Sequence, residues 1–491
     1  MDSPVSNELL NHSHRGNEIN PVEAFGKTLG KPPWRQDVLE FACENKQTYA
    51  SFRHGQPASP PTWLPSCRPG FQDTDMTRFS DPQRLERLIE GLDRFNATPG
   101  KGTTRLTYTP EFRQASDYLR GQMEAAGLTV REDAIGNLVG CLVGHNPALA
   151  PVMIGSHFDS VPNGGKFDGP AGVIAGIEIA FLLKERGLVP ERSIEFVAMI
   201  EEEGMRFGGG LLASRVMTGK VDMDEFLAFA DDAGITVADA MQAYGLEPAQ
   251  APLAVREAGS VHAFLELHIE QGPVLEAHAD DVAIVDRIVG LGQIRATFRG
   301  QAGHAGTTPM NVRRDALVGA VAALSQLPDL ARAIGQDAVL TVGKMDVRPG
   351  GANVIPDLVS FTVDIRAPGE EVVRTLIDQA RSVIELVGGN GLGVDVEEQI
   401  FLPPVPLSAE LHEALSRHAD TLGLKRRTMV SGAGHDAMIM ADFAPTGLVF
   451  VPSRNGISHA PEEWTSYDQL ARGVDVLFLV LCELAGATPQ S

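Results

Sequence analysis

The sequence predicts an α/β protein in which a mainly parallel sheet is interrupted by a smaller ferredoxin-like α+β domain. Two observations lead to this fold class. From about residue 77 onward, short apolar runs of strand length alternate with helical patterns, which is typical of a parallel sheet with crossover helices. Within that series, residues 285–402 follow their own order of strand, helix, strand, strand, helix and strand.

The composition limits the class of protein before any motif is considered. The chain has 491 residues, of which 43% are hydrophobic and 21% are charged, as in a folded globular protein. This length exceeds the roughly 250–300 residues that one core usually holds, so we expect at least two domains. The 41 basic and 64 acidic residues give a net charge of −23, which argues against nucleic acid as a partner.

Neither a membrane span nor a secretory signal is expected. No apolar run approaches the ~20 residues of a membrane helix, and Met1–Ala24 lacks the apolar centre of a signal peptide. The four cysteines form no Cys-x-x-Cys pair, which excludes a thiolate zinc site and a disulfide scaffold: Cys43, Cys67, Cys141 and Cys482. We therefore expect a cytoplasmic protein.

Residues 1–76 differ from the rest of the chain, since they are Pro-rich between Pro57 and Pro65 and show no sustained periodicity. We expect a poorly ordered extension there, with one helix near Arg35–Asn45.

The regular pattern that follows predicts helices after Asp81-Pro82, at Pro110–Gly127 and at Ala171–Arg186, and strands at Leu128–Glu132, Asn137–Val143, Val152–Gly155 and Ser193–Ile200.

The second half of the chain predicts the inserted domain. Residues 208–258 have a mostly helical pattern, and His262–Ile269 is a strand. The insert is expected to contain strands at Ile294–Arg299, Ala338–Val347, Leu358–Arg366 and Val394–Phe401, with helices at Asn311–Leu327 and Glu370–Val387. The α/β pattern resumes after Pro403-Pro404, so residues 77–284 and 403–491 should form one discontinuous domain around the insert at 285–402.

Polar clusters follow several of the predicted strands, where open α/β sheets place their sites. His157 and Asp159 come directly after the strand that begins at Val152, and Asp168 precedes the apolar helix. A carboxylate two residues from an imidazole can fix the orientation that metal binding needs. Either residue alone could also be a solvated or capping group in a loop.

A second cluster, Glu201-Glu202-Glu203, follows the strand that ends at Ile200. Neighbouring carboxylates repel one another unless cations neutralise them. One of them can bind a metal while another takes a proton from water. An acidic turn exposed to solvent is the alternative.

A third cluster places Glu266, His268 and Glu270 on one face of a strand, where three polar residues are unusual for a core. Two further clusters contain His435 and His459, each of which could instead be a single core histidine. Taken together, the imidazole and carboxylate side chains are a donor set suited to zinc or a similar divalent ion: His157, Asp168, Glu203, His268 and His459.

These motifs resemble the M20 metallopeptidase clan, and within it the amidase branch of N-carbamoyl-L-amino acid hydrolase, β-ureidopropionase and allantoate amidohydrolase. The strings that carry the resemblance run in family order from about residue 155 to 466: GSHFDSVPNGGKFDGPAGV, EEEGMRF, ELHIEQGPVLEA, GHAGTTPM, RRDAL, GGANVIP, SGAGHDA and GISHAPEEWTS. The resemblance covers roughly residues 80–485. It implies a di-metal catalytic domain interrupted by a lid, which usually also makes the homodimer contact.

The resemblance also implies roles for individual residues. Two divalent metal ions per subunit are expected, zinc first, with manganese, cobalt or nickel as alternatives. His157, Asp168 and His268 would bind one ion, and Asp168, Glu203 and His459 the other. Glu202 would be the general base, and Asp159 would orient His157. The peptidase branch usually has a carboxylate at the position of His268, so this histidine favours an amidase.

Substrate contacts are implied in the same way. His304 would reach the site of the partner subunit and polarise the scissile carbonyl, and Arg366 would bind the substrate carboxylate bidentately. Gln271, Asn353 and His435 would contact the ureido or carboxylate group. Without the resemblance, Arg366 could be a surface ion-pair residue, Asn353 a turn residue and His304 an ordinary loop residue.

The sequence therefore predicts a metal-dependent hydrolase of a linear C–N bond, acting on a small anionic ureido acid. The expected reaction converts an N-carbamoyl-L-amino acid to the amino acid, CO2 and NH3. Allantoate is the first alternative substrate, and β-ureidopropionate the second. An aminoacylase or exopeptidase activity, or a non-catalytic binding protein on the same scaffold, would be a different outcome, although a binding protein would have no need of Glu202.

Overall fold

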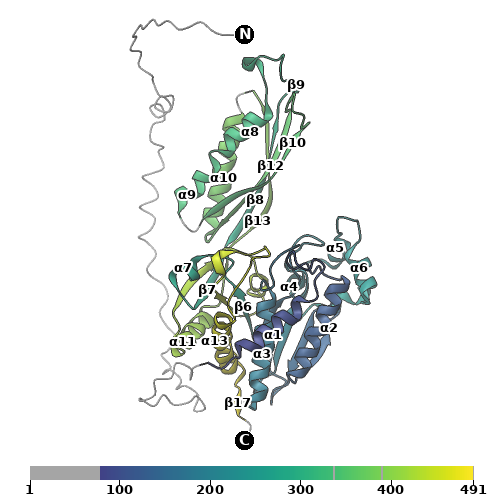
Figure 1. Ribbon diagram of the computed structural model, residues 1–491, viewed down its shortest axis with the longest axis vertical. Helices are drawn as coiled ribbons and strands as arrows, with labels where there is room; N and C mark the ends of the chain where they lie inside the picture. Colours follow the sequence, from purple (N-terminus) through teal and green to yellow (C-terminus); the bar gives the residue numbers. More distant parts are fainter. Residues whose placement is uncertain (1–77, 336–337, 389–390, 490–491) are drawn as a thin grey trace, which may run out of the picture. The chain divides into compact units, whose positions relative to one another are not determined.

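The computed structural model describes residues 78–335, 338–388 and 391–489, and Figure 1 shows their helices and strands. The extension expected at residues 1–76, with its helix near 35–45, lies outside the described residues. The described chain has a mixed α/β architecture with a mainly parallel central sheet, which confirms the predicted fold class.

In the described chain, the larger sheet has nine strands in the order β1-β2-β5-β3-β6-β16-β7-β14, with β15 paired to β7. The central strands β5, β3, β6 and β16 are all parallel, while β1, β2, β7 and β14 make antiparallel pairs. The strands are β1 Thr129–Glu132, β2 Leu138–Leu142, β3 Val152–His157, β5 Ile194–Met199, β6 Ala263–Ile269, β7 Val282–Ile288, β14 Val405–Pro406, β15 Arg426–Ser431 and β16 Thr446–Val451.

Helices pack on this sheet through their apolar residues. Helix α3 is buried along nearly its whole length and packs on β3, β5 and β6, while α13 packs on β6 and β16. Helix α1 begins at Pro82 because the Asp81 side chain accepts the N–H of Gln83 at 2.9 Å. The bounds are α1 Pro82–Asp93, α2 Pro110–Ala125, α3 Pro170–Glu185, α11 Ala409–Thr421, α12 Asp436–Met440 and α13 Tyr467–Ala485.

Shorter elements connect the larger ones. The region from residue 208 to 258, predicted to be mostly helical, contains α4 Leu212–Met217, α5 Met223–Ala228, α6 Val237–Tyr244 and the 3-10 helix η2 Pro248–Ala254. The remaining short elements are α7 Val274–His278, η4 Arg454–Gly456 and the paired strands β4 Leu188–Val189 and β17 Thr488–Pro489.

The second sheet forms the lid and has the antiparallel order β10-β12-β8-β13 among the described residues, which is the ferredoxin-like order. Helices α8, α9 and α10 lie on one face of it (Figure 1), around a core that includes Phe298 and Phe361. The elements are β8 Gly290–Arg299, α8 Ala316–Leu324, α9 Leu327–Ile334, β10 Val339–Arg348, β12 Leu358–Ala367, α10 Glu370–Gly388 and β13 Gly393–Leu402. A small antiparallel pair of β9 Gly303–His304 and β11 Val354–Ile355 is separate from this sheet, and η3 Met310–Val312 follows β9.

Two of the predicted boundaries that differ from the structure concern the lid. The helix predicted at Asn311–Leu327 begins only at Ala316, because the Asp315 side chain caps it by accepting the N–H groups of Leu317 and Val318. The predicted start of the insert at residue 285 falls inside β7, which stays paired in the larger sheet up to Ile288. The first strand of the lid sheet therefore begins at Gly290.

One described segment meets the length and hydropathy criteria of a membrane span, namely Ala316–Ile334 with a mean hydropathy of 1.3. No such segment was predicted from the sequence. It consists of two helices, α8 and α9, and its buried residues Ala320, Ala323 and Leu327 belong to the lid core. The match is weak evidence for a span, since an apolar helix that packs on a sheet has the same composition.

Candidate active site

The predicted site residues come together at the carboxyl ends of the central strands. Strand β3 ends at His157, the Glu201–Glu203 turn follows β5, His268 lies near the end of β6, and the loop with His459 follows β16. These four strands are parallel, so their carboxyl ends meet at one edge of the sheet. Parallel pairing therefore collects residues from distant parts of the sequence.

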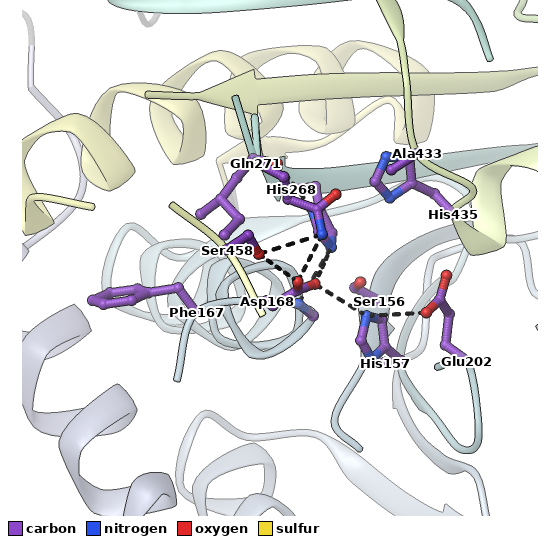
Figure 2. Close-up of polar contacts among 12 residues, drawn as sticks. Ser156, His157, Phe167, Asp168, Glu202, His268, Gln271, Ala433, His435 and Ser458 are labelled. Carbon is purple, nitrogen blue, oxygen red and sulfur yellow. Dashed lines mark hydrogen bonds and ion pairs between the residues drawn. The ribbon is translucent and has the colours of Figure 1, made fainter. Parts of the chain in front are cut away.

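The first group of candidate ligands contains His157, Asp168 and His268, all of them buried. Asp168 Oδ1 lies 3.1 Å from His268 Nε2 and 3.8 Å from His157 Nε2 (Figure 2). The other ring nitrogen of His268, Nδ1, lies 2.9 Å from the Ile269 carbonyl oxygen. That contact suits an Nδ1–H donor and leaves Nε2 as a ligand atom.

The second group contains Asp168, Glu203 and His459. His459 Nε2 lies 3.2 Å from Asp168 Oδ2 and 3.6 Å from Glu203 Oε2. Asp168 thus directs one carboxylate oxygen to each group. This is the geometry expected of a carboxylate that bridges two cations.

The close packing at Asp168 explains why glycine follows it. Gly169 has a φ of +79°, and a Cβ atom there would lie 2.3 Å from the imidazole ring of His157. Only glycine combines that backbone conformation with so close an approach. The Asp168–Gly169 turn therefore brings the Asp168 carboxylate close to the His157 ring.

Two carboxylates at this edge are destabilised in their charged form. Burial, with the nearby Asp168 carboxylate, raises the pKa of Glu203 to about 7, and burial raises the pKa of Glu202 well above its usual range. Glu203 Oε1 is buried and makes no hydrogen bond within the described chain. Nitrogen and oxygen donors, clustered negative charge and an unsatisfied carboxylate oxygen all fit divalent cations at this site.

Asp159 supports both the first histidine and the acidic turn. Its Oδ1 lies 3.3 Å from His157 Nδ1, and its two carboxylate oxygens accept the N–H groups of Glu202 and Glu203 at 3.1 and 3.2 Å. Glu202 Oε2 lies 3.7 Å from His157 Nε2 (Figure 2). Its carboxylate borders the ligand cluster and forms a third candidate ligand group with His157 and Glu203.

A cavity of about 220 Å3 opens beside the two ligand groups. Three of the predicted substrate-binding residues line it: Gln271, Arg366 and His435. Arg366, on β12 of the lid sheet, donates to the Gly432 carbonyl at 2.9 Å and to Asp364 at 3.0 Å. The cavity is lined by Asp168, Glu202, Glu203, Leu211, His268, Gln271, Arg366, Ala433, Gly434, His435 and His459.

His304 and Asn353 do not line this cavity. They lie close together at the paired strands β9 and β11, where the Ala305 N–H donates to the Asn353 carbonyl at 2.9 Å and both side chains belong to exposed residues. Neither residue reaches the cavity within the described chain. Glu270, placed by sequence on the same strand face as His268, instead caps α7 by accepting the N–H groups of Val274 and Leu275.

Sequence reasoning missed three residues of the site: Leu211, Ser458 and Glu463. Ser458 Oγ lies 2.9 Å from Asp168 Oδ2 and 2.7 Å from Glu463 Oε2 (Figure 2 shows the contact with Asp168). The Glu463 carboxylate also accepts the N–H groups of Phe167 and Asp168 at 2.9 and 3.0 Å. Glu463 therefore joins the Asp168 turn to the His459 loop, and its place in the string GISHAPEEWTS is the only sequence signal for this role.

Comparisons with known proteins agree with this fold. Residues 153–483 match the Peptidase family M20/M25/M40. The chain is 44% identical over 400 residues to the N-carbamoyl-L-amino-acid amidohydrolase of Paenarthrobacter aurescens, covering 81% of this chain and 97% of that protein. It is 39% identical over 404 residues to the allantoate amidohydrolase of Escherichia coli strain K12, covering 82% and 98%.

A solved structure gives the same result. The amidase of the hydantoinase/carbamoylase family from Burkholderia multivorans superposes with a TM-score of 0.76 at 35% identity, covering 83% of this chain and 98% of that one. The fold and the ligand groups define a hydrolase of the metallopeptidase type. The chain belongs to peptidase family M20, and its relatives place it on the amidase branch.

Proposed function

We propose that this protein hydrolyses an N-carbamoyl-L-amino acid to the L-amino acid, CO2 and NH3. One observation carries the proposal: a single cavity is lined by four of the five candidate ligands, by Glu202 and by Arg366, and the fifth candidate ligand, His157, lies behind Asp168 at 3.8 Å. A ureido acid has a carbonyl and a carboxylate, and this cavity offers a complementary group to each. The relatives named for this activity, with identities up to 44%, support the same substrate class.

His157, Asp168 and His268 would hold one divalent ion, and Asp168, Glu203 and His459 a second. Zinc is the first candidate, and manganese, cobalt or nickel accept the same donors. Such ions, when bound, polarise a carbonyl and lower the pKa of water.

The protein's own groups perform the remaining steps. Glu202 takes a proton from the attacking water and later passes it to the leaving nitrogen. Asp159 fixes both the Glu202 backbone and the His157 ring. Arg366 binds the substrate carboxylate at the lid side of the cavity, while Gln271 and His435 contact the polar groups between the two ends.

We also propose a homodimer in which His304 of one subunit completes the site of the other. Two observations support it: His304 is exposed away from the cavity of its own chain, and the lid presents apolar side chains to solvent, among them Met310 at 75% and Val318 at 62% exposure. Mixing an inactive His304→Ala chain with an inactive Glu202→Gln chain should then restore activity, because one site per mixed dimer keeps both groups. No recovery after subunit exchange would contradict the shared site.

The experiment that tests the function measures ammonia release from N-carbamoyl-α-amino acids, N-carbamoyl-β-alanine and allantoate with the metal-loaded enzyme. N-acetyl amino acids and dipeptides separate amidase from aminoacylase and exopeptidase activity. Allantoate remains the second candidate, since a relative with 39% identity is named for it.

Glu202→Gln tests the proposed base. It should lower kcat by about 10²- to 10⁴-fold while the bound metal stays stoichiometric, because the proton acceptor is lost and the proposed ligands remain. Full activity of this variant would refute the role of Glu202. Bound metal without turnover of any ureido acid by the unaltered enzyme would indicate a binding protein.

A further inference from the structure

One wall of the cavity is apolar, although most of the lining is charged or hydrogen-bonding. The apolar wall consists of Leu211, Ala433 and Gly434. It lies in the same cavity as the ligand groups and Arg366, which would hold the two polar ends of a ureido acid. The wall is therefore available to the substituent on the carbon between those ends.

The backbone of Leu211 is fixed at both of its polar groups. Its N–H donates to the Glu202 carbonyl at 2.6 Å, and its own carbonyl accepts the Arg215 N–H at 3.0 Å and the Ser214 hydroxyl at 3.1 Å. Its φ is +54°, in the left-handed region that few leucines adopt. Because the Leu211 backbone is hydrogen-bonded to the backbone of Glu202, the proposed base, Leu211 stays at a constant distance from the reacting bond.

The loop that leads to Leu211 is also tightly closed. A Cβ atom on Gly204 would lie 2.4 Å from the backbone nitrogen of Gly210, so the two ends of the loop touch. The buried Glu201 carboxylate accepts the N–H groups of Arg206 and Phe207 at 3.1 and 2.8 Å. These contacts hold the left-handed conformation of Leu211 in place.

Leu211 and Gly434, the two sides of the apolar wall, lie close to each other. A Cβ atom added to Gly434 would lie 3.9 Å from Leu211 Cδ1, which is ordinary van der Waals contact. Glycine is not required there by a left-handed backbone, because the φ of Gly434 lies outside the positive range. An extra methyl group at Gly434 would therefore narrow the cavity beside the apolar wall without straining the backbone.

We infer that Leu211 sets the specificity of the enzyme by contacting the substituent on the α-carbon of the substrate, and that the preferred substrates are N-carbamoyl derivatives of amino acids with apolar side chains. The inference rests on the proposed function. A polar substituent, such as the second ureido arm of allantoate, would lose hydrogen bonds to water at this wall without replacing them. An apolar side chain would gain from the same burial.

The test compares kcat/KM for N-carbamoyl-L-leucine, N-carbamoylglycine and allantoate. The unaltered enzyme should prefer the leucine derivative to the glycine derivative by about tenfold or more. Leu211→Ala should lower this ratio about tenfold, because the methyl groups that contact the side chain are removed. Leu211→Asn, whose side chain tolerates the left-handed backbone, should raise the ratio of allantoate to the leucine derivative by about tenfold or more.

Two further variants keep the test decisive. Gly434→Ala should also lower the leucine-to-glycine ratio, since the added methyl group occupies space that a large side chain needs. The matched control is Leu253→Asn at a leucine that is 77% exposed, and it should leave all ratios unchanged. A loss of folding lowers every rate together and does not move a ratio.

The outcomes separate the two proposals. If the unaltered enzyme hydrolyses ureido acids but the ratios stay within about twofold in the Leu211 and Gly434 variants, the specificity inference is wrong and the proposed function stands. If the unaltered enzyme hydrolyses none of the three compounds, the proposed function fails and the inference with it.

Discussion

Metal binding by this protein should depend steeply on pH, because two proposed ligands carry protons near neutrality in the metal-free state. The hydrogen bond to Asp168 raises the pKa of the His459 imidazole to about 9, although burial opposes that shift. Burial, with the Asp168 charge, raises the pKa of Glu203 to about 7. Each group must lose its proton before it can bind a cation, so metal binding competes with protons.

These two values give the size of the effect. A ligand with a pKa of about 9 costs about tenfold in affinity per pH unit below that value, so His459 contributes about 100-fold between pH 8 and pH 6. Glu203 is about half protonated at pH 7 and contributes a further factor of about 10 over the same interval. The affinity at the second ligand group should therefore fall about 10³-fold from pH 8 to pH 6, with about 1.5 protons released per ion at pH 7.

Calorimetric titration of the metal-free protein with zinc, in two buffers of different ionisation enthalpy, measures the protons released. Competition with a chelator at pH 6, 7 and 8 measures the affinity. His459→Ala should reduce the release to about 0.5 proton, whereas the exposed histidine variant His145→Ala should leave it unchanged. Stoichiometric binding with an affinity that does not change from pH 6 to pH 8 would refute the reasoning.

Two further predictions concern buried carboxylates, those of Glu463 and Asp475. Glu463→Gln should weaken zinc binding about 10- to 100-fold at constant pH, because Glu463 positions the Asp168 turn; an unchanged affinity in a folded variant would contradict this role. Burial raises the pKa of Asp475 to about 6, so its carboxyl group contributes about 3 kcal/mol of stability that is present below about pH 4 and is lost as the pH rises through 6. The free energy of unfolding of Asp475→Asn, measured by heat or denaturant, should rise by about that amount relative to the unaltered protein between pH 4 and pH 7. A difference between the two proteins that stays constant with pH would contradict this role of Asp475.

The fold was largely predictable because local patterns agree with it. The four strands of the lid sheet and the helices α8 and α10 were read in the correct order from apolar periodicity, whereas α9 was not predicted as a separate helix; the helices at Pro82 and Pro110 carry side-chain caps that sequence can suggest. The start of α8 was missed because residues 311–314 were included in the predicted helix, whereas part of them belongs to the 3-10 helix η3 and Asp315 caps α8 after them. A capping hydrogen bond decides such a boundary, and periodicity alone does not reveal it.

The site was predictable only in part. His157 and His268 lie at the ends of strands, and Asp168 lies in the loop after β3. Sequence could predict them because α/β sheets place their sites at the ends of strands. Glu463 lies beyond the last predicted ligand and acts through backbone N–H groups of a loop almost 300 residues earlier in the chain. Leu211 has no polar side-chain group to attract notice, and the role proposed for it rests on its position on the cavity wall.

The sequence by itself determined the class of fold, the identity of the proposed ligands and the family, since these depend on residue type, spacing and order. The tertiary structure decided which oxygen of Asp168 meets which histidine, which of the predicted substrate residues reach the cavity, and that His304 and Asn353 do not. The physical reason is strand pairing. Parallel register places residues from four strands within a few ångströms of one another, and no local pattern encodes that distance.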